Sequence, residues 1–143
     1  MKVIFLDVDG VLNDWDTSAL SKYLWYKKSC IEQLQLLVKN TGAKIVVSST
    51  WKYSDELLSK LKNVLEEYGM FVHDVTPDLD DKPPEIRAYL EAHPEIEKYV
   101  VLDDDDFFKE FGWNCVRTLG YLRMGLDEQY RCVAESVLNG SEH

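Results

Sequence analysis

The chain has 143 residues, 16 of them basic and 26 acidic, so its formal net charge is −10. This length suits one domain with a sizeable core, residues 1–143, and the acidic balance excludes an extended nucleic-acid-binding surface, which would be basic. The three cysteines form no Cys-x-x-Cys pair, which excludes a disulfide framework and a zinc knuckle. Because no apolar run reaches membrane-spanning length and no signal peptide is recognisable, we expect a cytoplasmic protein that does not enter a membrane.

The first half of the chain alternates between strand and helix patterns. Val3–Leu6 is an apolar run of strand length, and residues 11–28 are a mixed stretch that indicates a loop or short flap. Apolar side chains then recur at helical spacing over Ile31–Val38, before the stop signal Asn40-Thr41-Gly42. A second short buried strand is expected over Ala43–Val47.

The same alternation continues to the end of the chain. Helices are expected over Asp55–Tyr68 and Asp127–Leu138. Between them, a further helix is expected that has Pro84 in its first turn and ends near His93-Pro94. The further expected strands are Met70–Val75, Tyr99–Leu102 and Asn114–Arg117. Strands that alternate with helices in this way are typical of a mostly parallel sheet covered on both faces. The sequence therefore predicts an α/β fold, a Rossmann-like three-layer α/β/α arrangement with about five strands.

Polar residues follow three of the expected strands directly. The first strand runs into Asp7–Gly10, the second into Ser48–Thr50 and the fourth into the aspartates Asp103–Asp106. Ligands of parallel sheets bind at the carboxyl ends of the strands, so these stretches are expected to meet at one edge. A carboxylate at the end of a buried strand is costly unless it is paired, hydrogen-bonded or metal-bound. This favours a divalent-cation site over the alternative, in which the acids are solvated loop residues or helix caps.

Four segments together resemble the four motifs of the haloacid dehalogenase superfamily. They are Leu6–Asn13, Val47–Lys52, the lysine Lys82 before a helix, and Val101–Asp104. In detail they look like the small phosphatase-type domains of that superfamily found in RNA-repair proteins. The resemblance implies a Mg²⁺-dependent phosphohydrolase that works through an aspartyl-phosphate intermediate.

The resemblance also implies a role for individual residues. Asp7 would be the nucleophile and a magnesium ligand, and Asp9 would be the general acid and base, with its backbone carbonyl reaching the metal. Ser48 would hydrogen-bond the phosphoryl group, and Lys82 would neutralise Asp7 and the phosphoryl oxygens. The alternatives are that Ser48 only bonds local backbone in a turn and that Lys82 is a solvated loop charge with Arg87 nearby.

Three further assignments depend on the same resemblance. Asp104 takes the position of a direct metal ligand and Asp103 lies beside it, but the run of aspartates leaves the assignment ambiguous by one residue. Ser49 is the fallback for the phosphoryl contact. Lys52 is expected at the mouth of the pocket, where it would bind substrate.

Little room is left for a cap domain, so we expect no cap or a minimal one. An open site suits the phosphorylated end of a polymer better than a small metabolite, and a bound cation can handle one nucleic-acid phosphate despite the acidic balance. A nucleic-acid end or a nucleotide is therefore the expected substrate. The alternatives are a phosphoprotein phosphatase, a non-catalytic interaction or regulatory domain of the same fold, and a phospho-accepting receiver domain; the oligomeric state stays open.

Overall fold

The computed structural model describes residues 1–14, 25–119 and 125–140, and the structural statements below concern these ranges. Five strands form one sheet in the order β3-β2-β1-β4-β5, and each neighbouring pair is parallel. The strands are β1 (Lys2–Leu6), β2 (Lys44–Val47), β3 (Val72–Val75), β4 (Lys98–Asp103) and β5 (Cys115–Arg117). The predicted parallel sheet of about five strands is confirmed.

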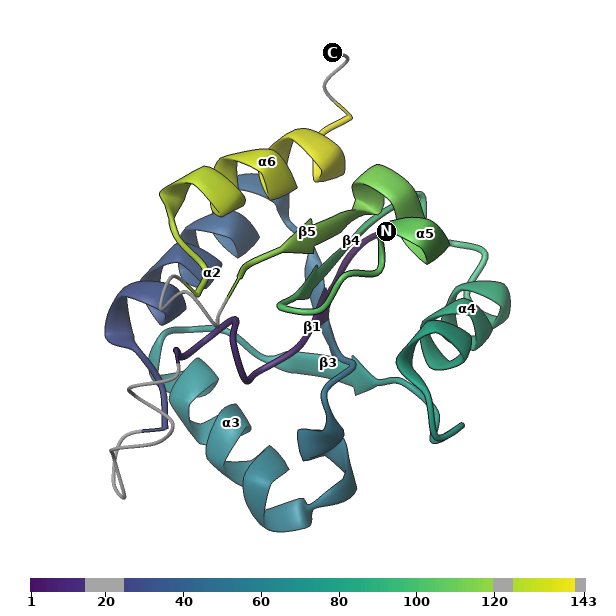
Figure 1. Ribbon diagram of the computed structural model, residues 1–143. Coiled ribbons are helices and arrows are strands. Elements are labelled where there is room, and N and C mark those ends of the chain that lie inside the picture. Colours follow the sequence, from purple (N-terminus) through teal and green to yellow (C-terminus); the bar gives the residue numbers. More distant parts are fainter. Residues whose placement is uncertain (15–24, 120–124, 141–143) are drawn as a thin grey trace.

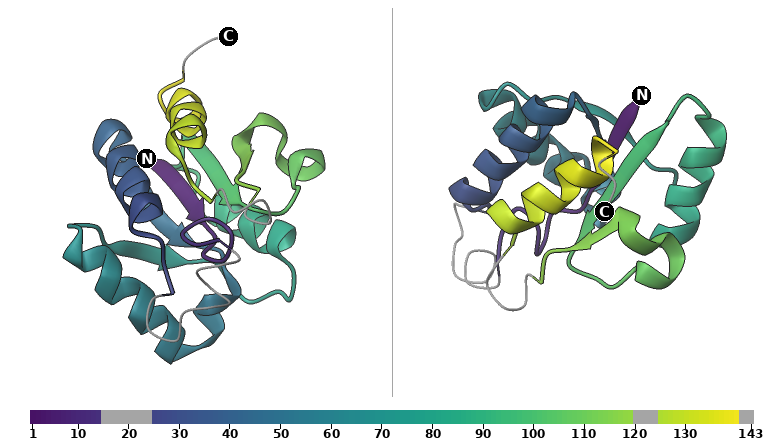
Figure 2. Two further views of the ribbon diagram at one scale, coloured as in Figure 1. Left: turned by 60° about the vertical axis from the view of Figure 1, so that its left-hand side comes forward. Right: turned by 90° about the horizontal axis from the view of Figure 1, so that it is seen from above.

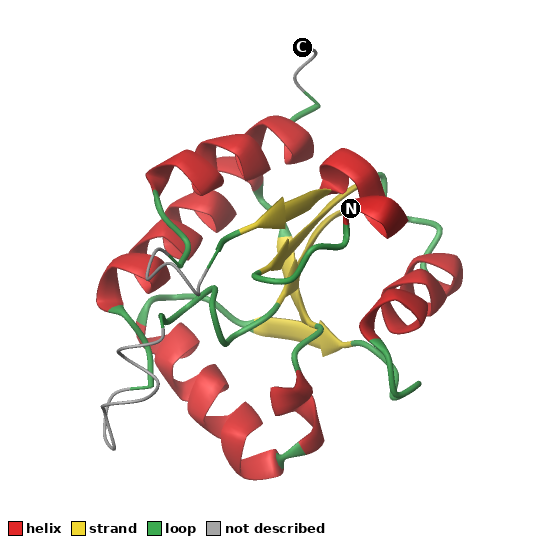
Figure 3. Cartoon of the chain, viewed as in Figure 1, coloured by secondary structure: helices red, strands yellow, loops and turns green. Residues whose placement is uncertain are grey.

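Helices cover both faces of this sheet (Figures 1 and 2). One face carries α2 (Lys28–Thr41), α3 (Asp55–Glu67) and α6 (Glu128–Leu138), and the other carries α4 (Lys82–Ala92) and the short α5 (Phe108–Phe111). Two single-turn 3₁₀ helices, η1 (Thr50–Tyr53) and η2 (Gly112–Asn114), lie in the connections (Figure 3). The predicted three-layer α/β/α architecture is therefore confirmed.

The central strand β1 explains the two-sided core. Successive side chains of a strand point to opposite faces, so Ile4 and Leu6 pack under α2, α3 and α6, whereas Val3 and Phe5 pack under α4 and α5. All four side chains are fully buried. A strand buried on both faces needs a continuous apolar run, which is the pattern that the sequence shows at this point.

The strand order reverses beside β1. The chain moves outward from β1 through β2 to β3, and then returns to the other side of β1 for β4 and β5. The register pairs Leu6 with Val47 on one side and with Leu102 on the other. The residues that follow, Asp7, Ser48 and Asp103, therefore emerge level with one another at the carboxyl edge, where such sheets bind ligands.

Helix α4 begins earlier than the sequence pattern indicates. The sequence pattern puts Pro84 in the first turn and Lys82 before the helix, but the helix starts at Lys82, with Pro83 and Pro84 both in its first turn. Proline lacks an N–H and has a helix-compatible φ, so it fits the first turn, where N–H groups have no helical partner. As a result Lys82 lies on the first helical residue instead of in a flexible loop.

The described residues show no inserted cap at two connections. Only η1 and α3 lie between β2 and β3, and only residues 76–81 lie between β3 and α4. Much of the expected flap over residues 11–28 lies outside the described residues. Within the ranges that the structure describes, none of the helices has the length and apolar character needed to cross a membrane.

Candidate active site

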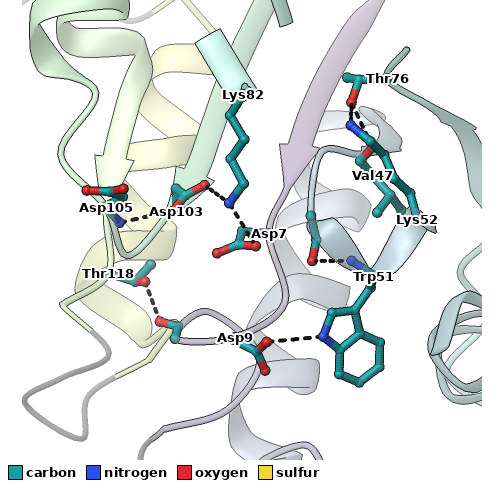
Figure 4. A network of polar contacts seen from close by, with 12 residues as sticks. Asp7, Asp9, Val47, Trp51, Lys52, Thr76, Lys82, Asp103, Asp105 and Thr118 are labelled. Atoms are coloured by element: carbon teal, nitrogen blue, oxygen red, sulfur yellow. Dashed lines mark hydrogen bonds and ion pairs between the residues drawn. The ribbon is translucent and has the colours of Figure 1, made fainter. Parts of the chain in front are cut away.

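Asp7 lies at the centre of the carboxyl edge, immediately after β1. Its backbone N–H donates to the carbonyl oxygen of Leu102 at 3.0 Å, which continues the pairing of β1 with β4. The residue is 6% exposed, and its carboxylate Oδ1 lies 3.0 Å from the amino nitrogen of Lys82 (Figure 4). Burial and the neighbouring Asp103 raise the pKa of Asp7 to about 7, although Lys82 acts in the opposite direction.

Lys82 bridges two carboxylates from different strands. Its amino group lies 3.0 Å from Asp7 Oδ1 and donates to Asp103 Oδ2 at 2.8 Å. Burial lowers its pKa, but the two carboxylates outweigh this and hold the pKa above its usual range, so the side chain is a cation. Arg87, the other basic residue nearby in sequence, instead lies over the ring of Phe111. The structure thus brings Lys82, and not Arg87, to Asp7.

Three carboxylates converge beside Lys82. Asp7, Asp103 and Asp104 each offer an oxygen, and these oxygens all lie within 4.8 Å of one another. Asp103 is fully buried. The pKa of Asp104 is raised by its own burial and by the negative charge of Asp103. Lys82 supplies one positive charge against three carboxylates, so the group has an excess of negative charge that a cation would offset. An all-oxygen donor set fits a hard divalent cation, and both Asp103 and Asp104 belong to it.

Gly10 allows Asp104 to approach the loop after β1. Its φ is +82°, a conformation that side chains rarely adopt, and a Cβ placed there would collide with the carboxylate of Asp104. The carbonyl oxygen of Gly10 accepts a hydrogen bond of 2.5 Å from the hydroxyl of Thr118, which follows β5 (Figure 4). A glycine is therefore required after the two aspartates, because the carboxylate of Asp104 packs against this position.

Asp9 lies apart from the three converging carboxylates. Its Oδ2 accepts a hydrogen bond from the indole Nε1 of Trp51 at 3.1 Å (Figure 4). Its Oδ1 accepts one from the amide of Asn13, also at 3.1 Å. Asn13 in turn accepts from the N–H of Gly10, and the Trp51 ring packs on Trp25. The two aspartates of the first motif are thus held by different partners.

Ser48 presents an unpartnered hydroxyl. Its N–H donates to the carbonyl oxygen of Leu6 at 3.0 Å, and the residue is 1% exposed, yet its Oγ has no hydrogen-bond partner among the described residues. Ser48 and Lys82 both line a cavity of about 330 Å³. A buried hydroxyl without a partner is unfavourable unless a ligand supplies one. An oxygen-rich group in this cavity would provide it.

Ser49 and Lys52 make contacts within the chain. The Oγ of Ser49 accepts from the N–H of Trp51 and so caps η1. The amino group of Lys52 lies 2.8 Å from Glu85 Oε1, and the Lys52 side chain is 3% exposed. The substrate-binding role expected of these two residues stays a prediction.

Three contacts of this site were not predicted from the sequence pattern. The pattern alone leaves Trp51 as either a pocket or a core residue, and it does not mark Asn13 or Thr118. Their contacts with Asp9 and Gly10 depend on how separate loops meet at the sheet edge. Only for Trp51 could the residue type have indicated a polar contact, because a buried indole N–H usually has an acceptor.

The combined arrangement suits phosphoryl transfer. A carboxylate nucleophile, an adjacent ammonium group and an unpartnered hydroxyl are the groups that such chemistry requires. If a divalent cation is held by Asp7, Asp103 and Asp104, it supplies the charge that offsets a bound phosphoryl group.

Of the comparisons with known proteins, the one with family models found a match. A family model described as "HAD domain in Swiss Army Knife RNA repair proteins" matches residues 3–129, which include every residue of the site described above. Neither the comparison with curated proteins nor that with solved structures gave a match. Since the family match covers most of the chain and the predicted motifs lie in order within it, the chain belongs to the HAD domains of Swiss Army Knife RNA repair proteins.

Proposed function

We propose that the protein is a Mg²⁺-dependent phosphohydrolase that forms an aspartyl-phosphate on Asp7 and acts on a phosphorylated nucleic-acid end or a nucleotide. The family is of phosphohydrolase type. The observation that carries the proposal is the convergence of Asp7 with Lys82 and the carboxylates of Asp103 and Asp104. Lys82, a member of this group, lines the same cavity as Ser48, whose hydroxyl has no hydrogen-bond partner among the described residues.

In the first step, an oxygen of Asp7 attacks phosphorus, and the bond from phosphorus to the leaving oxygen breaks. Asp9 gives a proton to that oxygen. Lys82 and Ser48 bind the phosphoryl oxygens, where negative charge is concentrated. In the second step Asp9 takes a proton from water, the water oxygen attacks phosphorus, and inorganic phosphate leaves with Asp7 regenerated. Mg²⁺, held by Asp7, Asp103 and Asp104, would offset the negative charge in both steps.

Metal removal tests the proposal directly. We expect phosphate release from an aryl phosphate to stop in excess EDTA and to return with Mg²⁺. Mg²⁺ at ten times its Kd is expected to stabilise the folded protein by about 1.4 kcal/mol, measured as a rise in Tm. Asp104→Asn is expected to lose most of that rise, because it removes one of three converging carboxylates. Turnover that continues unchanged in EDTA contradicts the metal assignment.

The charge around the cavity bears on the choice of substrate. Asp80 and Asp81 are exposed and line the same cavity as Ser48 and Lys82. Two unit charges about 7 Å apart repel by roughly 0.6 kcal/mol in water, and more near a protein surface. Within the proposed substrate class, this favours an end or nucleotide that carries a single phosphate over one with further phosphates close to the scissile bond.

Removal of these two charges is expected to relax that preference. Asp80→Asn/Asp81→Asn should raise kcat/KM for a phosphorylated oligonucleotide by about 3- to 10-fold at low salt, with little change for an aryl phosphate. The gain should disappear in 0.5–1 M salt, roughly, because screening is then nearly complete. Glu66→Gln/Glu67→Gln, exposed on α3, is the matched control for net charge. An equal gain in that control would show a general charge effect and no role for the cavity.

A further inference from the structure

A buried ion pair lies beside the candidate active site. Glu85 is 1% exposed, and its carboxylate accepts three hydrogen bonds: from the amino group of Lys52 at 2.8 Å, the hydroxyl of Tyr53 at 2.7 Å and the N–H of Leu79 at 2.9 Å. Burial raises the pKa of Glu85, but these donors, with Lys52 first, hold it below its usual value. Glu85 is therefore an ionised carboxylate with both oxygens in use.

Lys52 is equally well partnered. Besides Glu85, its amino group donates to the hydroxyl of Thr76 at 2.7 Å and to the carbonyl oxygen of Pro77 at 3.4 Å (Figure 4 shows the Thr76 contact). Thr76 is tied to the sheet, because its N–H donates to the carbonyl oxygen of Val47 at 3.0 Å. The three N–H groups of the ammonium group thus have three acceptors, on Glu85, Thr76 and Pro77.

The pair joins the segments that carry Ser48 and Lys82. Lys52 lies in η1, which follows Ser48 and Ser49 directly, and Glu85 lies in the first turn of α4, three residues after Lys82. Residues 76–79, which bond to both members, connect β3 to this turn. The network therefore ties the end of β2 to the start of α4.

A buried ion pair is a poor source of stability, because desolvation offsets much of the attraction and apolar residues of similar size often serve as well. Its directional hydrogen bonds, however, fix the relative position of the elements that it joins. Lys82 must lie within hydrogen-bond distance of both Asp7 and Asp103. An error of about 1 Å in such a group can lower the rate about 100-fold.

We propose that Lys52 and Glu85 are positioning residues, whose ion pair sets the first turn of α4 so that the amino group of Lys82 faces Asp7 and the end of β2. This inference rests on the proposed function. It gives Lys52 an indirect role, in contrast to the direct substrate contact expected from the sequence. The two roles differ in what they change: a positioning role acts on kcat through Lys82, and a substrate contact acts on KM independently of Lys82.

The test uses the paired variant Lys52→Met/Glu85→Leu, because either single substitution leaves one buried charge without its partner and can prevent folding. With an aryl phosphate and saturating Mg²⁺, we expect kcat to fall about 10- to 100-fold and KM to stay within about twofold. Circular dichroism and a Tm well above the assay temperature confirm that the variant is folded.

A double-mutant cycle with Lys82 identifies the route of the effect. In the Lys82→Met background, the paired substitution should lower kcat by less than about threefold, because its effect passes through Lys82. A folded paired variant with wild-type kcat would overturn the proposal. A second outcome would also overturn it: a raised KM, together with a loss of activity in the combined variant equal to the product of the separate losses. That outcome would restore Lys52 as a substrate contact.

The wild-type measurement separates this inference from the proposed function. If wild type and Asp7→Asn release phosphate equally, the proposed function itself fails. If wild type alone is active and the paired variant matches it, the phosphohydrolase assignment stands and only the positioning role is lost.

Discussion

Asp7→Asn is expected to lower kcat by at least about 1,000-fold while the protein stays folded. Asparagine has nearly the same shape, but its amide oxygen is a far weaker nucleophile than a carboxylate. Asp7 is 6% exposed and belongs to a group of three carboxylates, so removal of its charge reduces repulsion within the group. We therefore expect a metal-free Tm at or above that of wild type, together with loss of turnover.

The measurement is phosphate release together with detection of the intermediate. Wild-type protein quenched in acid during turnover should carry one phosphoryl group on the peptide that contains Asp7, and Asp7→Asn should carry none. Asp55→Asn, an exposed residue in the first turn of α3, is the matched control and should keep wild-type kcat. Equal turnover by wild type and Asp7→Asn, or a phosphoryl group on a different peptide, contradicts the aspartyl-phosphate mechanism.

The sheet was predictable because β1, β2 and β4 contain continuous buried apolar runs and the longer helices show a period. The runs Val3–Leu6 and Tyr99–Leu102 lie within β1 and β4, and the central position of β1 accounts for the complete burial of Val3–Leu6. The short elements η1, α5 and η2 were missed, because three or four residues do not span one period of a helix pattern.

The candidate site divides into contacts of two kinds. Residues at strand ends, such as Asp7 and Asp103, could be placed together because parallel strands bring their carboxyl ends to one edge. The contact of Lys52 with Glu85 joins residues 33 positions apart in the sequence, and that of Trp51 with Asp9 joins residues 42 positions apart. Neither follows from a local pattern, because each depends on the path of a loop over the sheet edge.

The separation of Asp9 from the three converging carboxylates indicates that the two aspartates have separate tasks. Asp7 belongs to the acidic group and contacts Lys82. Asp9 is held outside it by donors from Trp51 and Asn13. A residue that hands a proton to the leaving oxygen and later takes one from water should not be a member of the group that binds metal through its side chain. The proposed mechanism therefore uses the side chain of Asp9 only for proton transfer.

This division makes the effect of Asp9→Asn depend on the leaving group. An activated aryl oxide leaves without a proton, so Asp7 can still attack phosphorus, but the second step loses its general base. With such a substrate we expect a burst of one equivalent of phenol per site, followed by turnover about 100- to 10,000-fold below wild type. With an alkyl phosphate the first step also needs the proton, so we expect no burst.

Trp51→Phe serves as the matched variant, because it keeps a smaller aromatic ring against Trp25 and removes the N–H that holds Asp9. It should show the same dependence on leaving group with a smaller loss, since Asn13 still donates to the other oxygen. Rapid-quench kinetics of phenol and phosphate release measure both steps. Steady turnover of the aryl phosphate by Asp9→Asn at the wild-type rate, without a burst, would show that water is activated by another group and that Asp9 serves only as a structural acceptor for Trp51 and Asn13.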